Sequence, residues 1–297
     1  MNFSNNIYLG KITSCHTQAV FNAYFQNRNF RDYILFEIAT TNPFGVRHIP
    51  NDLNRILDSY LDFDLGLDRA FELLDIQYRI SFSKDVKYSL NLLKQWLKKD
   101  SVVVGPLNME DLSYLYYPQL YKALDHYLVV QKYQNKTLTL LDSEGIAYIE
   151  IDEDKFIKAW KADKIIEGRG EYMMRQILKK ERIEISQEKL KKLYLFIVEN
   201  LDKAQQQSAY KKIMEIKDKH MLNSLTYAIP NRLQKLYIQK KFFEYNENII
   251  SLLNRQIAIF SDILSNIFGK KDIDFNKFNE IDKIENSLLI EMKKLIK

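Results

Sequence analysis

Apolar residues in the first hundred positions recur mainly at the three- and four-residue spacing of helices. This spacing predicts one helix from Cys15 to about Phe25 and a second helix that ends near Ala39. Further helices are expected over 52–60, 67–74 and 86–98, and strands over 77–82 and 101–105. The polar segment 40–45, which contains Pro and Gly, predicts a turn. Helices that precede strands along the chain indicate an α+β fold.

The stretch from residue 123 to residue 142 predicts a β-hairpin. Tyr, Leu and Val dominate its first half, and Thr alternates with Leu in its second half. With a three-residue connecting loop, Tyr133 pairs with Thr137. His126 then lies on the same face as Asp142, one diagonal step away. A two-residue loop would place these two side chains on opposite faces, so the geometry at His126 depends on the length of the turn.

After residue 152 the pattern becomes helical. A strand over 146–151, a short helix over 153–161 and a break over 165–170 come first. Longer helices are then expected from Ser186 onward, over 229–268 and over 274–296. Pro230 is expected near the start of the second of these helices, and Gly269 at its end. We therefore expect an α+β domain over 1–154 and an all-helical domain over 155–297.

The single cysteine of the chain, Cys15, falls in the first turn of the first predicted helix. Ser14 or Thr13 is suited to cap this helix. A helix N-terminus carries positive partial charge and free N–H groups, so we expect a lowered thiol pKa and backbone donors for an oxyanion. His126 supplies a general base and Asp142 a carboxylate that orients it. The predicted catalytic triad is therefore Cys15, His126 and Asp142.

Four segments of the first half carry a resemblance to a known family. They are the Cys15 helix with Asn22, the turn Asn42-Pro-Phe-Gly45, the segment Val102-Val-Val-Gly-Pro-Leu107 with Leu112-Ser-Tyr-Leu-Tyr-Tyr-Pro118, and the hairpin from Asp125-His126 to Asp142. Their order resembles that of the papain-like cysteine enzymes. Within that group the chain is most similar to the family typified by butirosin biosynthesis protein H, which is related to the peptidases that trim double-glycine leaders. The resemblance covers roughly residues 10–150, and it implies a papain-like cysteine protease fold ahead of the helical C-terminal domain.

The resemblance also implies a function. Members of that family transfer acyl groups from carrier-protein thioesters to amines, and relatives form amides in thiotemplated peptide pathways such as that of closthioamide. It thus implies an ATP-independent cysteine acyltransferase of natural-product biosynthesis that forms an amide bond. Its partners would be an acyl or peptidyl carrier protein, whose phosphopantetheine arm carries the substrate, and a small-molecule amine acceptor. Papain-like peptidases have a Gln before the cysteine to complete the oxyanion hole. No Gln precedes Cys15, and Asn5 or Asn6 is the candidate replacement.

Four other residues are candidate substrate contacts. Tyr114 and Tyr117 lie on the approach to the hairpin and would form a wall beside the cleft, with ordinary packing as the alternative. His16 follows Cys15 and would point about 100° around the helix, toward the substrate or toward solvent. Asp125, with Asp111 as a second candidate, would bind a cationic amine acceptor.

The composition of the chain limits the classes of function. Its 297 residues are 46% hydrophobic and 28% charged, which is typical of a globular protein. One cysteine, a start without a basic or apolar segment, and the lack of ~20 consecutive apolar residues favour a cytoplasmic protein that does not enter a membrane. Neither the spacing of metal ligands nor a glycine-rich phosphate loop occurs in the sequence, so we expect no metal and no bound cofactor.

The net charge of +5 is unevenly divided along the chain. Residues 1–152 carry 15 Lys and Arg against 18 Asp and Glu, a net charge of −3, and the remainder carries +8. A basic half suits an acidic partner such as a carrier protein or a nucleic acid. Lysines on solvated helix faces explain the same excess more simply, and we expect no nucleic-acid partner.

Two other functions use the same residues. A papain-like peptidase or thioesterase would apply the triad to a peptide or an ester, with water as the acceptor. A non-catalytic binding protein would retain the fold without the reaction, and its basic helical domain would then be the working part.

Overall fold

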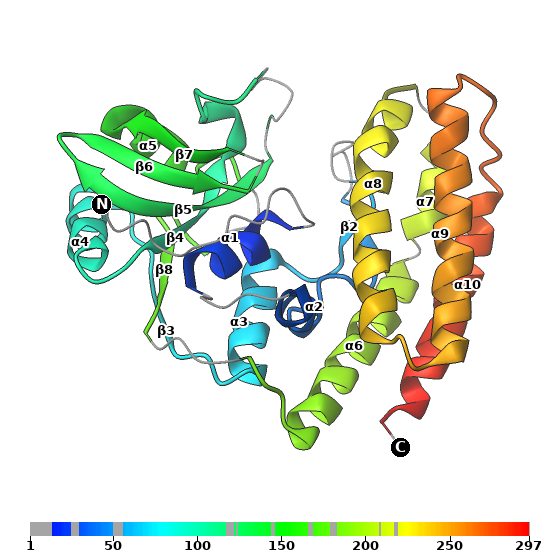
Figure 1. Cartoon of the computed structure of the whole chain (residues 1–297). Coiled ribbons are helices and arrows are strands. Elements are labelled where there is room, and N and C mark those ends of the chain that lie inside the picture. Colours follow the sequence, from blue (N-terminus) through cyan, green and yellow to red (C-terminus); the bar gives the residue numbers. More distant parts are fainter. Residues whose placement is uncertain are drawn as a thin grey trace. The chain divides into compact units, whose positions relative to one another are not determined.

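The computed structural model of the chain describes residues 14–24, 30–49, 56–116, 122, 124–143, 146–165, 169–178, 183–207, 209–216 and 219–296. These residues form a mixed α+β protein with a six-stranded sheet and a helical C-terminal region (Figure 1).

The chain forms two compact units, and each unit consists of two separate segments. Unit 1 comprises Met1–Asn29 and Asp75–Arg182, and unit 2 comprises Phe30–Leu74 and Ile183–Lys297. This division differs from the contiguous one that we predicted with a boundary after residue 154. Unit 1 continues beyond that point, and unit 2 includes a segment from the first half of the chain. The chain therefore passes from one unit to the other three times.

Unit 1 is built on one antiparallel sheet with the strand order β3-β8-β4-β5-β6-β7. The strands are β3 (Tyr78–Ser81), β4 (Val102–Asn108), β5 (Asp125–Gln134), β6 (Thr137–Asp142), β7 (Ala147–Asp152) and β8 (Met174–Ile177). The strands predicted over 77–82, 101–105 and 146–151 are confirmed. β8 falls in the region expected to be all-helical, and that expectation is wrong there. A four-residue strand that buries Arg175 and Gln176 has no alternating pattern to detect.

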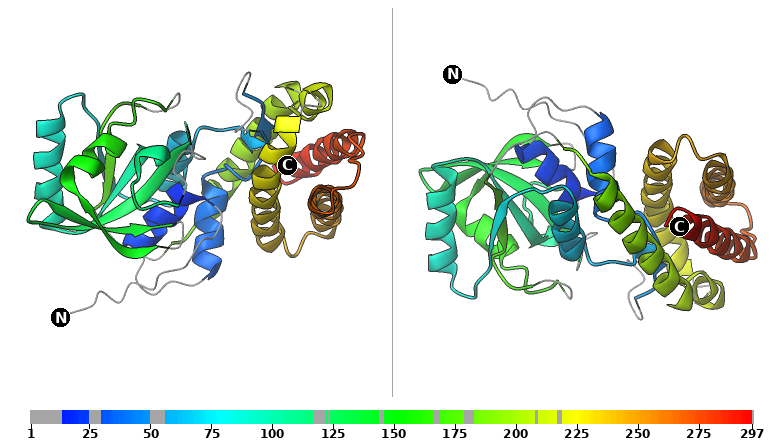
Figure 2. Two further views of the ribbon diagram at one scale, coloured as in Figure 1. Left: turned by 90° about the horizontal axis from the view of Figure 1, so that it is seen from above. Right: turned by 90° about the horizontal axis from the view of Figure 1, so that it is seen from below.

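Helices cover both faces of this sheet. They are α1 (Cys15–Tyr24), α4 (Val86–Leu97) and α5 (Glu153–Trp160), and a short helix η2 (Met109–Asp111) follows β4. Side chains from α4 and α5 form one apolar core with the strands, and Leu128 of β5 belongs to it. Because side chains alternate along a strand, Tyr127 faces away from that core, and its ring contacts His16 of α1. Figure 2 accordingly shows the sheet between α4 and α1.

A two-residue turn joins β5 to β6, in place of the three-residue loop that the favoured geometry required. Asn135 and Lys136 have φ values of 51° and 60°, as both central residues of a type I′ turn must. Gln134 consequently pairs with Thr137. This turn alone would place His126 and Asp142 on opposite faces.

A β-bulge in β5 reverses that effect. At Gln131, β5 contains one residue more than β6, and the register shifts by one position. Leu128 therefore pairs with Asp142, which is the pairing that the three-residue loop would have produced. His126 lies two positions before Leu128, so it shares a face with Asp142, as predicted.

Unit 2 consists mainly of helices. They are α2 (Phe30–Ala39), α3 (Phe63–Leu73), α6 (Gln187–Gln207), α7 (Ala209–Ile216), α8 (Lys219–Phe242), α9 (Glu247–Phe268) and α10 (Lys277–Lys294), with a small sheet of β1 (Val46–Arg47) and β2 (Asp58–Ser59). α9 packs against both α8 and α10 (Figure 1). The predicted helix that begins at Ser186 is confirmed as α6, and Gly269 ends α9 as predicted.

Three expectations for unit 2 are wrong. The described part of segment 52–60 contains β2 instead of a helix. Segment 229–268 is two helices, because the side chain of Asn246 accepts a hydrogen bond from the Ile249 N–H and begins α9 there. Pro230 lies inside α8, not at its start. A proline removes one hydrogen bond from a helix, and the buried neighbours of Pro230 keep α8 continuous.

Buried polar contacts hold the turn at residues 40–45 within unit 2. The carbonyl oxygen of Pro43 accepts hydrogen bonds from Arg232 and Gln239, each at 2.6 Å. Arg232 also forms an ion pair with Glu285 at 2.7 Å, and both side chains are 1% exposed. The predicted turn is therefore part of the interior of unit 2.

Candidate active site

Cys15 is the first residue of α1, as predicted. The carbonyl oxygen of Ser14 accepts a hydrogen bond from the Gln18 N–H at 2.9 Å, which makes Ser14 the N-cap residue. The first N–H groups of a helix have no hydrogen-bond partner within the helix. The backbone N–H groups of the first turn, which begins at Cys15, therefore point out of the helix end. Cys15 is half-buried as a residue, and its thiol is enclosed by the protein.

His126 links Cys15 to Asp142. Its Nε2 lies 2.7 Å from Oδ1 of Asp142, and the exposed fractions of the two side chains are 1% and 0%. A carboxylate only accepts hydrogen bonds, so Nε2 carries the ring proton and Nδ1 is the nitrogen left for the thiol. Cys15 is hydrogen-bonded to the His126 side chain. The structure therefore brings the three predicted residues together from α1, β5 and β6.

Asp142 is held at both carboxylate oxygens. Its Oδ2 accepts a hydrogen bond from the phenol of Tyr114 at 2.5 Å. Its backbone N–H also donates to the carbonyl of Ile146 at 2.9 Å. Sequence reasoning missed the link between Tyr114 and Asp142, because Tyr114 lies in an irregular loop whose path no periodicity indicates.

The charges of Cys15 and His126 depend on burial and on each other. Burial raises the pKa of the Cys15 thiol, and it outweighs the hydrogen bond and the charge of His126, which act to lower that pKa. The expectation of a lowered thiol pKa is therefore wrong. Burial also opposes the imidazolium form of His126, but the Asp142 carboxylate overcomes it and holds the pKa of His126 well above its usual range. The two shifts are coupled, because the thiol and the imidazole are hydrogen-bonded to each other and titrate as one pair.

The remaining predicted contacts differ in their surroundings. His16 is buried, with its ring centroid 5.8 Å from that of Tyr127, so the option that it faces solvent is wrong. All residues of α1 after Cys15 are buried, so this helix has no exposed side on which His16 could lie. Asp125 is half-buried, and its negative charge raises the pKa of the Cys15 thiol. Tyr117 lies outside the described residues, as do Asn5 and Asn6.

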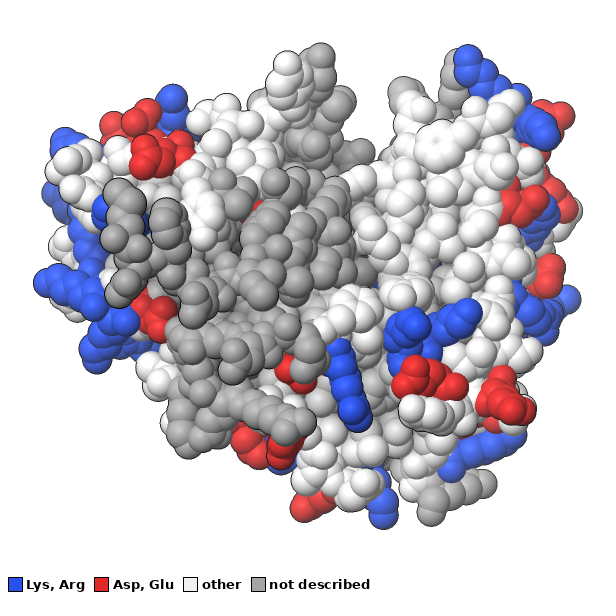
Figure 3. Space-filling model, in the orientation of Figure 1, with Lys and Arg blue, Asp and Glu red and all other residues white. Residues whose placement is uncertain are grey.

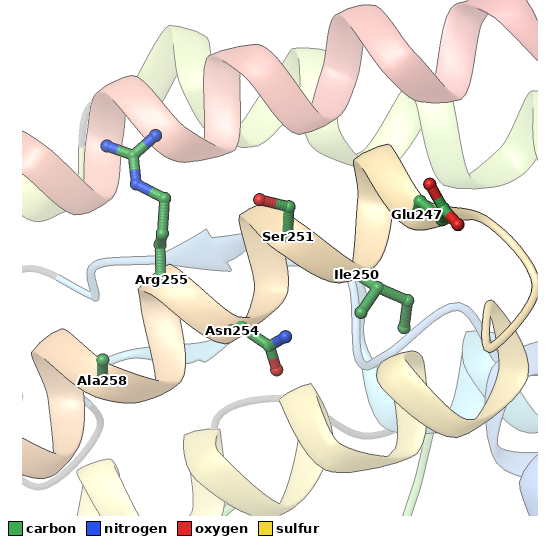
Figure 4. Close-up of a pocket in the computed structure, with 6 residues that line it drawn as sticks. All are labelled: Glu247, Ile250, Ser251, Asn254, Arg255 and Ala258. Carbon is green, nitrogen blue, oxygen red and sulfur yellow. The ribbon is translucent and has the colours of Figure 1, made fainter.

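A separate hollow lies along α9 in unit 2. It is lined by Glu247, Ile250, Ser251, Asn254, Arg255 and Ala258, all from this one helix. Ser251 and Arg255 extend from the opposite side of α9 to Ile250 and Asn254, so the polar groups diverge (Figure 4). Arg255 is also paired with Glu280 of α10 at 3.4 Å. The hollow therefore has no convergent set of groups for chemistry.

The charge asymmetry along the chain does not follow the two units. Unit 2 carries 24 Lys and Arg against 23 Asp and Glu, a net charge of +1, and unit 1 carries 20 against 16, a net charge of +4. Over the helices of unit 2, blue and red side chains are interspersed (Figure 3). The choice between lysines on solvated helix faces and an acidic partner therefore stays a prediction.

Among the described residues, no group of three or more His, Cys, Asp and Glu side chains is placed to hold a metal ion. None of the helices in the described ranges has the length and apolar character needed to cross a membrane.

Comparison with known proteins assigns no family. No known family model matches the chain. The uncharacterized protein YobF of Bacillus subtilis (strain 168) is 31% identical over 113 residues, which is 38% of this chain. The match spans only 37% of the length of YobF. The name of that protein indicates no activity, so the interpretation of the site depends on its geometry.

Proposed function

We propose that the protein is a cysteine-dependent acyltransferase that forms an amide bond. Cys15 is the nucleophile, His126 the general acid and base, and Asp142 the residue that orients His126. We also propose that unit 1 has the papain-like fold that the sequence resembles. The observation that carries the proposal is the buried chain of hydrogen bonds from the thiol of Cys15 through His126 to Asp142.

In the first step, the proton of the Cys15–His126 pair lies on His126, and the Cys15 sulfur attacks, as the thiolate, the carbonyl carbon of an acyl thioester. The backbone N–H of Cys15 and one further donor hold the oxyanion that forms. As this intermediate collapses, the new bond from the Cys15 sulfur to carbon remains and the bond to the carrier thiol breaks. The carrier thiolate takes the proton from His126 and leaves.

In the second step, an amine nitrogen attacks the carbonyl carbon of the acyl-enzyme and loses a proton to His126. The bond to the Cys15 sulfur breaks, the amide leaves, and the proton stays on His126 beside the thiolate. Asp142 fixes the ring tautomer throughout and stabilises the imidazolium that forms in both steps. The donor is already activated as a thioester, so the cycle needs neither ATP nor a metal.

The substrate class comes from the resemblance. The donor would be an acyl group on the phosphopantetheine arm of a carrier protein, and the acceptor a small amine in natural-product biosynthesis. Asp125 favours a cationic amine as the acceptor, because this half-buried residue carries a negative charge close enough to the Cys15 thiol to influence its pKa.

Intact-mass measurement tests the proposal directly. The protein is mixed with acyl pantetheine thioesters of several chain lengths, and with the same acyl groups loaded on a carrier protein. Because Cys15 is the only cysteine, a thioester-linked mass increase reports on this one residue. We expect the increase in the wild type and none in Cys15→Ala. Addition of a panel of primary amines should remove the adduct and yield the corresponding amide.

Other outcomes assign the chain to the alternatives. An adduct that disappears equally fast without amine, with only free acid as product, would identify a thioesterase or peptidase that uses the same triad. The absence of an adduct with every free and carrier-bound donor would contradict catalysis and favour a binding protein on this fold.

A further inference from the structure

The proposed reaction leaves one polar contact of the triad without a role. Asp142 uses one oxygen to bind His126, and its other oxygen accepts the phenol of Tyr114. Asp142 is fully buried, so neither oxygen is exposed to bulk solvent. The partner of the second oxygen is therefore part of what determines the orientation and the charge distribution of this carboxylate.

The loop around Tyr114 is anchored on both sides. Leu112 and Leu115 are buried in the core of unit 1, and the Leu115 N–H donates to the Leu112 carbonyl at 3.1 Å. The Tyr114 side chain itself packs against that core. Two positions later, Tyr116 is 83% exposed. Within the described part of this loop, Tyr114 is thus turned inward to Asp142 and Tyr116 is turned to solvent.

We propose that Tyr114 is a positioning residue for Asp142, and through it for His126, instead of a wall for the substrate. This inference rests on the proposed function. The hydrogen bond at Oδ2 prevents the buried carboxylate from rotating away from His126. It also withdraws negative charge from Asp142, which moderates the pull of Asp142 on the imidazole proton. His126 can then release that proton in each half of the cycle.

The test compares Tyr114→Phe with Tyr116→Phe, its matched control in the same loop. The pKa of His126 is measured by NMR titration of the imidazole, and the pH profile of Cys15 alkylation by iodoacetamide is measured in parallel. In Tyr114→Phe we expect the midpoint of His126 to rise by about half a unit, and the alkylation profile to change with it. In Tyr116→Phe both should match the wild type. A His126 midpoint in Tyr114→Phe that is unchanged or lower would overturn the inference.

Kinetics separate positioning from substrate contact. With an acyl donor that the wild type accepts, a positioning role lowers kcat in Tyr114→Phe by about tenfold with little change in KM. A rise in KM with kcat unchanged would instead identify the substrate wall. If Tyr114→Phe does not fold, a fluorinated tyrosine at position 114 serves as the second variant. Its more acidic phenol is a stronger donor, so the midpoint of His126 should fall.

The titration needs no acyl donor, so this inference and the proposed function can fail separately. A shifted His126 in Tyr114→Phe, together with a wild type that forms no adduct, would keep the positioning role and reject acyl transfer. A normal adduct with an unshifted His126 would keep acyl transfer and reject the positioning role.

Discussion

Asp142 and His126 face each other at 2.7 Å inside unit 1, and neither side chain is accessible to solvent beyond 1%. The pair spans two adjacent strands, so it also contributes to the stability of unit 1. This contribution depends on pH, because the carboxylate holds the pKa of His126 well above its usual range.

The stability of unit 1 should therefore fall at alkaline pH. The pKa of His126 in the folded state exceeds its unfolded value of about 6.5. The ion pair therefore stabilises unit 1 fully below pH ~6.5, and this stabilisation is lost as the pH rises through the folded-state pKa. In Asp142→Asn, we expect a free energy of unfolding lower by about 3 kcal/mol at pH 6, and a smaller difference at high pH. Urea unfolding followed by tryptophan fluorescence measures this, since Trp96 and Trp160 both lie in unit 1. If the difference in unfolding free energy between the wild type and Asp142→Asn does not change with pH, the pH dependence does not come from His126.

Alkylation of Cys15 should accelerate as the pH rises above the ordinary range of a thiol. Burial raises the thiol pKa, and His126 partly offsets this rise. Replacement of His126 by Asn removes that offset, so the pKa rises further, and at pH 8 the rate should fall about tenfold for each unit of pKa. The rate of iodoacetamide labelling, measured by intact mass, tests this. Protein unfolded in urea is the reference for an unperturbed thiol, and a faster rate in His126→Asn would contradict the expectation.

Asp125→Asn should have the opposite effect. The Asp125 carboxylate raises the pKa of the Cys15 thiol. Removal of this negative charge should lower the thiol pKa and increase the alkylation rate at pH 8 by roughly threefold. Asp154→Asn is the matched control, because Asp154 is an exposed residue of α5. Equal rates in the wild type and in Asp125→Asn would show that this charge is too far from the thiol to matter.

The buried ion pair of unit 2 should be costly to break from one side. Arg232→Met leaves the Glu285 carboxylate without its cation and removes a donor to Pro43, so we expect a loss of about 3–5 kcal/mol. In the double variant Arg232→Met/Glu285→Leu, the loss should be smaller than in the single variant, because no unpaired charge remains. Urea unfolding followed by circular dichroism of the helices measures both. A double variant less stable than the single one would contradict this reasoning.

Gln256 offers a stabilising substitution. It lies in the buried stripe of α9 and is 0% exposed, and neither of its side-chain polar atoms has a hydrogen-bond partner among the described residues. Gln256→Met should therefore raise the free energy of unfolding by about 1–3 kcal/mol. Gln239→Met is the matched control, since Gln239 is equally buried but donates to Pro43, and it should lower stability by about 1 kcal/mol. Loss of stability in Gln256→Met would show that this amide is satisfied in solution.

Local periodicity predicted the elements that carry the triad, and it could not predict how they are connected in space. The helix at Cys15 and both strands of the hairpin follow from the apolar spacing. The register at His126 depends on a bulge at Gln131, a polar residue with no distinguishing neighbours. The predicted face was right, although the predicted turn was not, because the two-residue turn and the bulge compensate.

Other features had no local signal at all. α2 is a short helix that is buried over most of its length, and nothing in its own residues indicates that it packs against α8, which follows residue 183. The contact of Tyr114 with Asp142 depends on an irregular loop, and β8 is too short for a pattern. Burial reversed the expected shift of the Cys15 pKa, because the surroundings of a thiol are set by the whole fold and not by its own helix.

The interleaved segments have a consequence for folding during synthesis. The Pro43 carbonyl lies 189 positions before Arg232 and 196 positions before Gln239, its two donors. Because the ribosome releases the chain from its N-terminus, residues 30–74 emerge long before the helices that bury them. Unit 1 can assemble from Met1–Asn29 and Asp75–Arg182 in that interval, before the Pro43 carbonyl has met Arg232 and Gln239. Residues 30–74 are therefore completed only when α8 is made, and translation that stops before α8 leaves that segment open to proteases.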